Sequence, residues 1–301
     1  MSTDSMAVLG DGLFFEEASQ IWKGKKELRR WPEDLREGAD LLEELFASGV
    51  ESFVLHGGDE LVSAVVTAYW RRRSLGAYPL EFWPLEMGSG FVAAEGKGDV
   101  SARRARAMIE RPARQWARRS VSTLRVVSSL EPGAWYGFSF GAGWVYRALE
   151  ARKRARGGAA NLVSAAGKLA MDTFQSEEEK SLAERVAINY SPRKGGEGSL
   201  LATTLSRSYF GITTTGAEAR YWDRLGTSGL LRRVVTPDLL ERVGGGESFE
   251  VIHLDGPGGW ALDGRLFQEP EPSVLEISPG PAVTLLSPPR GIGARLGRVF
   301  G

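Results

Sequence analysis

The chain has 301 residues, 42% of them hydrophobic and 25% charged, a composition typical of a globular protein and a length that allows two domains. Lys and Arg together number 38, as do Asp and Glu, so the basic surface that attracts nucleic acid is not expected and we predict no nucleic-acid partner. With no cysteine and two histidines, disulfides, thiolate ligands and a cysteine nucleophile are excluded, and little remains for a histidine metal site.

The first part of the chain alternates between strand-like and helix-like patterns. Residues 7–15 predict a short strand with a glycine turn, and residues 32–49 predict an amphipathic helix that ends at a glycine. A buried strand is expected over 51–58, then a helix over 60–76, then a strand, a turn and a short helix over 78–96. Strands that alternate with helices indicate a parallel sheet covered by helices, so this part is predicted to be α/β.

The pattern changes after an arginine-rich stretch at 101–119, which is typical of a surface helix or a connector. Short β-type runs follow over 121–129, 134–143, 185–191, 199–206, 248–256, 259–267, 274–278 and 282–287. A helical pair over 144–174 interrupts them, so this part is predicted to be mainly antiparallel β with inserted helices. We expect an α/β domain of nucleotide-binding type over 1–118, a β-rich domain over 119–288 and a tail over 289–301.

Two glycine turns follow predicted strands. Gly57 and Gly58 end the buried strand just before a helix that begins with two acids, and residues 84–90 contain a second turn. Glycine lets the backbone come close to a ligand, and the N–H groups of a helix's first turn face an anion. The alternative is an ordinary tight turn. Because neighbouring parallel strands end at one crevice, the pair of turns favours a phosphate site.

Four segments occur in a fixed order: a strand followed by GGD and a helix, PLEMGSGF at 84–91, FSFGAGW at 138–144, and a late LDG at 262–264. This order resembles the lipid kinase family of diacylglycerol, sphingosine and ceramide kinases and their bacterial relatives, over residues 50–288. The resemblance implies a two-domain lipid kinase fold, related to that of NAD kinases, in which an α/β domain and a β-rich domain hold ATP and Mg²⁺ between them. It also implies phosphorylation of a lipid hydroxyl.

The family's first segment reads G-G-D-G-T. Gly57, Gly58 and Asp59 match its first three positions, while Glu60 and Leu61 stand where Gly and Thr are expected. The resemblance implies that Gly57, Gly58, Asp59 and Glu60 bind the nucleotide, with Asp59 reaching the phosphates through Mg²⁺. A carboxylate at Glu60 suits the helix dipole but opposes a triphosphate unless Mg²⁺ lies between them.

The family's second segment reads P-L-G-T-x-N-D-F. Gly88 fits this pattern, and the resemblance implies that Gly88 and Ser89 form part of the nucleotide wall. The family's G, T, N and D are replaced here by Glu86, Met87, Ser89 and Gly90. These replacements change the side chains that would contact the phosphates and the base of the nucleotide.

The late segment corresponds to the family's D-G-E, whose Asp takes the proton from the attacking lipid hydroxyl. Asp263 and Gly264 match, and Arg265 replaces the Glu, so the resemblance implies that Asp263 is the catalytic base. An Asp-Gly pair between two β runs also predicts a hairpin turn, and the two roles are compatible. Arg265 either neutralises phosphate charge or is an exposed turn residue. His56 either contacts the ligand or is a hydrogen-bonded structural residue.

The resemblance thus implies ATP- and Mg²⁺-dependent phosphorylation of a lipid hydroxyl, such as that of diacylglycerol or ceramide. One alternative is a catalytically inactive protein of the same fold that acts as a lipid-binding or regulatory module, and another is a soluble kinase of a small metabolite. We expect no secretion signal and no transmembrane segment, hence a cytoplasmic protein. The arginines of the tail at 289–301 and of the stretch at 103–119, with Trp116, suit a peripheral position on the inner membrane face. The alternatives are a frayed terminus for the tail and a solvated helix face for the stretch.

Overall fold

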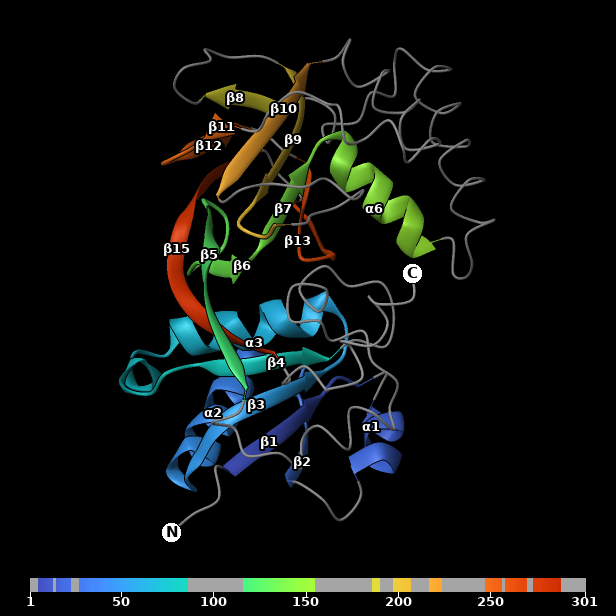
Figure 1. Cartoon of the computed structure of the whole chain (residues 1–301). Helices are drawn as coiled ribbons and strands as arrows, with labels where there is room; N and C mark the ends of the chain where they lie inside the picture. Colours follow the sequence, from blue (N-terminus) through green and yellow to red (C-terminus); the bar gives the residue numbers. More distant parts are fainter. Residues whose placement is uncertain are drawn as a thin grey trace, which may run out of the picture.

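The computed structural model describes residues 5–12, 15–22, 27–85, 116–154, 186–189, 197–206, 217–223, 247–255, 258–269 and 273–287. Figure 1 shows two lobes, which we call the first lobe (described residues from 5 to 85) and the second lobe (described residues from 116 to 287). The predicted site residues Gly88 and Ser89 and the tail at 289–301 lie outside the described residues.

The first lobe is a parallel sheet with helices packed on it. Its strands are β1 (Ser5–Gly10), β2 (Glu27–Arg30), β3 (Val50–His56) and β4 (Glu81–Leu85), in the order β4-β3-β1-β2 and with parallel pairs throughout. The helices are α1 (Phe15–Trp22), α2 (Leu35–Ala47) and α3 (Asp59–Arg71), and the 3-10 helix η1 (Arg73–Ala77) follows α3. β3 is buried at every residue except Glu51, as expected for a strand covered on both faces.

Local sequence explains where these helices begin and end. The side chain of Asp34 accepts hydrogen bonds from the N–H groups of Arg36 and Glu37, so it caps the start of α2. The chain leaves α2 through Gly49, whose φ of 88° suits glycine. Helix α3 carries acids in its first turn and Arg71 in its last, in agreement with the helix dipole.

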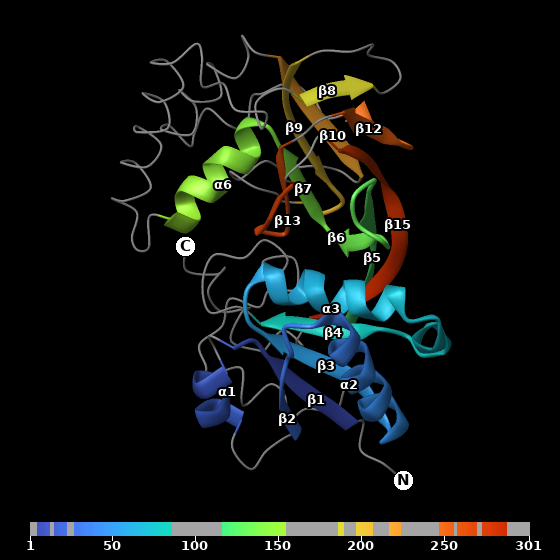
Figure 2. The same cartoon turned by 180° about the vertical axis from the view of Figure 1, so that it is seen from behind.

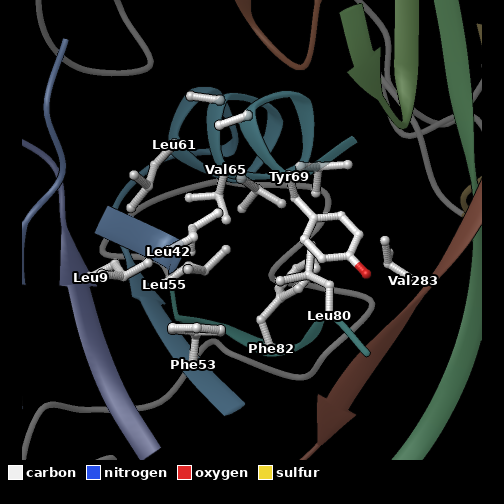
Figure 3. Packing of buried hydrophobic residues seen from close by; sticks show 14 of the residues in the cluster. Leu9, Leu42, Phe53, Leu55, Leu61, Val65, Tyr69, Leu80, Phe82 and Val283 are labelled. Carbon is white, nitrogen blue, oxygen red and sulfur yellow. The ribbon is translucent and has the colours of Figure 1, made fainter. Parts of the chain in front are cut away.

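The core of the first lobe lies between α2, α3 and the sheet. Leu61, Val65 and Tyr69 occur at intervals of four residues along α3 and point toward the strands, as Figure 3 shows. Phe53 and Phe82 supply the opposite side from β3 and β4. Each such side chain contributes about 1.5–3 kcal/mol when it leaves water, so α3 is held firmly on the sheet.

The second lobe is mainly antiparallel. Its elements are β5 (Ala117–Ser128), β6 (Trp135–Gly137), β7 (Ser139–Ala142), α6 (Trp144–Arg154), β8 (Val186–Asn189), β9 (Glu197–Thr203), β10 (Glu218–Asp223), β11 (Glu247–Ser248), β12 (Ile252–Asp255), β13 (Gly259–Leu262), β14 (Arg265–Gln268) and β15 (Val274–Ser287). The order along the sheet is β14-β13-β7-β9-β8-β12-β15. The next strand beside β15 is β4 of the first lobe, so one sheet extends through both lobes. The predicted combination of an α/β part with a β-rich part is confirmed.

Two long strands connect the lobes. β5 and β15 pair antiparallel from Leu275 opposite Ser128 to Ser287 opposite Ala117, and β15 also pairs parallel with β4 through Thr284 and Leu285. Figures 1 and 2 show these strands as a curved ribbon that runs from one lobe into the other, with α3 lying between the first-lobe sheet and the second lobe. The runs predicted at 274–278 and 282–287 are thus one strand, and the domain boundaries proposed after 118 and 288 stay predictions.

Several expectations need correction. Residues 117–119 were expected in a surface helix or connector, but they form the start of β5, where Arg118 pairs with Glu81. Trp116, for which a lipid-binding cluster and a solvated helix face were the two alternatives, is instead buried and packs edge-to-face on Trp83. In the parts of the chain that the structure describes, no helix is long and apolar enough to cross a bilayer.

Candidate functional site

The late LDG segment forms a two-residue hairpin turn between β13 and β14. Leu262 pairs with Arg265, and the two residues between them have φ angles of 49° (Asp263) and 83° (Gly264). Positive φ at both central residues defines the hairpin turn that Asp-Gly favours. The predicted turn is therefore confirmed, and it presents the Asp263 carboxyl toward β6 and β7.

The Asp263 carboxyl is buried and held by backbone donors. The Phe138 N–H donates to both carboxylate oxygens at 3.0 and 2.9 Å, and the Ser139 N–H donates to Oδ1 at 2.8 Å. The Asp263 N–H donates to the Ser139 carbonyl at 2.9 Å. A Cβ at Gly137 would collide with Oδ2, which explains why glycine stands at that position. The segment FSFGAGW, singled out in the sequence, thus forms the cradle of this carboxyl.

The environment raises the pKa of Asp263. Burial is the largest cause, and the negative charge of Asp59 is the second; the hydrogen bonds from Ser139 and Phe138 act in the opposite direction but are outweighed. The result is a pKa well above the ordinary value of 3.8. Asp59 of the first lobe and Asp263 of the second are therefore close enough to interact, although they lie far apart in the sequence.

The two glycines before α3 have different surroundings. A Cβ at Gly57 would lie 2.8 Å from Asp11 Oδ2 and 2.8 Å from a methyl carbon of Leu61, so a larger residue there would have to displace both side chains. Among the described residues, a Cβ at Gly58 would meet nothing within 4 Å. Gly58 is the N-cap of α3 and makes no side-chain capping bond. No side chain of the described segments thus fills the space at the start of this helix beside Gly58.

Glu60 connects the start of α3 to the second lobe. Its Oε1 accepts a hydrogen bond from Lys153 Nζ of α6 at 2.9 Å, and its Cγ lies 3.9 Å from the position of a Cβ at Gly264. The structure therefore brings Asp59 and Glu60 together with the turn at Asp263 and the end of α6. Lys153 was not singled out from the sequence, because it is one of several basic residues in its segment.

Two hydroxyl side chains dock the lobes beside this site. Ser63 and Thr67, both buried on α3, donate to the Tyr136 carbonyl of β6 at 3.0 Å each, and the Tyr136 N–H donates to Thr67 Oγ1 at 2.9 Å. The sequence signal was a pair of hydroxyls four residues apart on an apolar helix face. Sequence reasoning missed it because their partner is backbone.

Other residues singled out in the sequence have structural contacts. The guanidinium of Arg265 stacks on Trp135 at 4.8 Å and lies 5.7 Å from the Phe267 ring, and the Arg71 guanidinium lies 4.7 Å from the same Trp135 ring. His56 is buried, and its Nδ1 accepts a hydrogen bond from the Trp22 indole at 3.3 Å. These contacts favour structural roles for Arg265 and His56.

The expected Mg²⁺ was tested against the carboxylates of the site. Within the described residues, no group of three or more His, Asp and Glu side chains is placed to hold a metal ion. Mg²⁺ commonly uses one or two carboxylates together with water and substrate phosphates. Asp59, partly exposed at the start of α3, offers one such carboxylate, so the residues fit a Mg²⁺ ion that arrives with phosphate.

Comparisons with known proteins support the fold. No family model and no curated protein matches the chain. Among solved structures, a presumed diacylglycerol kinase from Bacillus anthracis str. Sterne matches with a TM-score of 0.63 at 13% identity, covering 96% of this chain and 99% of that one. A second structure, also described as a presumed diacylglycerol kinase from Bacillus anthracis str. Sterne, gives 0.63 at 12% identity over 96% and 99%. A third, described as a diacylglycerol kinase, gives 0.59 at 12% identity over 96% and 98%. The chain thus has a two-domain, diacylglycerol-kinase-like fold.

Proposed function

We propose that the protein is a kinase that transfers phosphate from ATP, with Mg²⁺, to a lipid hydroxyl such as that of diacylglycerol, ceramide or a related long-chain alcohol. The observation that carries this proposal is the approach of the start of α3 to the turn of the buried Asp263. Glu60 Cγ, next to Asp59, lies 3.9 Å from the position of a Cβ at Gly264, and the Asp59 charge acts on the Asp263 carboxyl. The similarity of the fold to structures named as diacylglycerol kinases supports a lipid as the molecule that accepts the phosphate.

Asp263 is assigned the role of general base. A base is more effective when its pKa lies nearer the working pH, and burial with the Asp59 charge raises the pKa of Asp263. Oδ2 accepts only the shared Phe138 N–H among the described contacts, and a carboxylate oxygen has capacity for a second hydrogen bond. The acceptor hydroxyl would donate its proton there.

The phosphate end is assigned to the first lobe. Gly57 and Gly58 shape the turn, Gly58 leaves room for a phosphate to approach the start of α3, and Asp59 would hold Mg²⁺. The ion would neutralise charge that develops on the transferred phosphoryl group. Gly88 and Ser89 would form part of the nucleotide wall. A cytoplasmic location, peripheral on the inner membrane face through the tail at 289–301, belongs to the same proposal.

A second candidate is a catalytically inactive protein of this fold that binds lipid or regulates a partner. It is favoured by the tight hold on Asp263, whose carboxyl fixes the backbone of Phe138 and Ser139 as a purely structural residue would. Glu60, paired with Lys153 where the family has glycine, favours it as well.

Binding and transfer are tested separately. Mg²⁺-ATP at about a hundredfold excess over Kd should stabilise the protein by about 2.7 kcal/mol in thermal unfolding. Asp263→Asn should keep this stabilisation and abolish transfer of labelled phosphate to mixed lipids, whereas Asp255→Asn, at an exposed position of β12, should retain both.

The outcomes separate the two candidates. No stabilisation of the wild-type protein by Mg²⁺-ATP or ADP would favour the inactive module. Stabilisation together with undiminished transfer by Asp263→Asn would remove Asp263 from the role of base while leaving a nucleotide site in place.

A further inference from the structure

The ion pair between Glu60 and Lys153 crosses from the first lobe to the second at the proposed phosphate end. Glu60 belongs to the first turn of α3 and immediately follows Asp59, and Lys153 lies near the end of α6. Their charged atoms are 2.9 Å apart. Glu60 also lies against the turn that carries Asp263, since its Cγ is 3.9 Å from the position of a Cβ at Gly264. The ammonium is thus held beside the residues assigned to phosphate and to proton removal.

This ion pair is exposed and easily exchanged. The side chains of Lys153 and Glu60 are 55% and 47% exposed, and pairs of this kind add little net stability because water competes for both charges. A polyphosphate beside Gly58 would repel the Glu60 carboxylate and attract the Lys153 ammonium. Lysine is a flexible point charge with three donors and can move between two nearby anionic partners.

We infer that Lys153 is a phosphate-binding residue of this site, which Glu60 holds in position when no nucleotide is bound. The inference rests on the proposed function and deepens it. When Mg²⁺-ATP enters, Lys153 leaves the carboxylate of Glu60 for a phosphate oxygen, so an ion pair between two protein residues is exchanged for one between protein and ligand. Lys153 would then supply at the start of α3 a positive charge that compensates for the unfavourable carboxylate at Glu60.

A purely structural role makes a different prediction. If the ion pair only ties α6 to α3, then removing either partner breaks the same contact, and both changes should affect nucleotide binding in the same direction. In the charge-exchange role the two changes have opposite signs. Lys153→Met removes the charge that binds phosphate, whereas Glu60→Gln removes the repulsion and releases Lys153.

The test is calorimetric titration of Mg²⁺-ATP into the full-length protein at low salt. We expect Lys153→Met to weaken binding about tenfold and Glu60→Gln to strengthen it several-fold, as one nearby unit charge allows in a solvated crevice. Arg29→Met and Glu44→Gln provide matched controls. They break another exposed ion pair, with 3.0 Å between the charged atoms, in the first lobe, and should leave the affinity unchanged.

The outcomes distinguish this inference from the function on which it rests. If both Lys153→Met and Glu60→Gln weaken binding, or neither changes it, while the wild-type protein binds Mg²⁺-ATP, the charge exchange is wrong and the nucleotide site stands. If the wild-type protein does not bind Mg²⁺-ATP, the proposed function fails and the inference fails with it.

Discussion

At the scale of single residues, Asp263 gives the protein a characteristic dependence of stability on pH. Burial, followed by the Asp59 charge, raises the pKa of Asp263 in the folded protein above the value expected when unfolded. Between these two values the folded protein binds more protons than the unfolded chain, so the free energy of unfolding falls as the pH rises. The resulting loss of stability is absent at pH values below the pKa of Asp263 in the unfolded chain. It is complete at pH values above the pKa of Asp263 in the folded protein.

We predict that Asp263→Asn removes this decline. An amide does not titrate, so the free energy of unfolding of Asp263→Asn relative to the wild-type protein should rise from about pH 4 upward. Urea denaturation at a series of pH values measures the difference. A difference that is the same at every pH would contradict the raised pKa.

Asp59→Asn provides the second half of this experiment. It removes the like charge but not the burial, so the pKa of Asp263 should fall in part and the decline should end at a lower pH than in the wild-type protein. Asp255→Asn, which changes an exposed carboxylate of β12, is the control and should not shift the decline.

At the scale of elements, segments with a clear hydrophobic period were predicted correctly as helices or strands. A charged strand without such a period was not predicted. The predicted helix at 32–49 corresponds to α2, and the predicted buried strand at 51–58 corresponds to β3, because their apolar residues repeat with a clear period. β2, with the sequence ELRR and mostly exposed side chains, shows no such period. An edge strand is defined by its backbone partner, here β1, and a single sequence does not record that partner.

The start of α3 allows a prediction about Gly58. Serine is as good as or better than glycine at an N-cap, and the space beside Gly58 is open, so Gly58→Ser should raise the stability by a few tenths of a kcal/mol. If a phosphate approaches this point, the hydroxymethyl group takes its place and Mg²⁺-ATP binding should weaken several-fold. Thermal unfolding and calorimetric titration measure the two effects.

Gly57→Ala is the matched contrast. Its Cβ would press on Asp11 and Leu61, so it should lower stability whether or not a nucleotide binds. Equal affinity of Gly58→Ser and the wild-type protein for Mg²⁺-ATP would argue against a phosphate at this helix start.

At the scale of the whole molecule, the site depends on how the lobes are joined. The GGDE and LDG segments could each be identified in the sequence, but only the family resemblance implied that they share a site. Local patterns could not show it, since their proximity follows from the pairing of β5 with β15 and from the docking of β6 on α3. The contact of Glu60 with Lys153 has the same origin. Long-range pairing of this kind is set by tertiary packing, and local sequence patterns do not predict it.

The docking of β6 on α3 yields the last prediction. Thr67→Val keeps the shape of the side chain but removes one donor to the Tyr136 carbonyl and leaves the partly buried Tyr136 N–H without its acceptor. We expect a loss of about 1–3 kcal/mol in urea denaturation. Ser63→Ala removes the other donor, yet the carbonyl keeps its bond from Thr67, so its loss should be smaller. Because β15 of the second lobe pairs with both β5 and the first-lobe strand β4, circular dichroism and tryptophan fluorescence should report one shared transition in each variant. A Thr67→Val protein no less stable than Ser63→Ala, or one whose two probes separate, would show that these hydrogen bonds do not hold the lobes together.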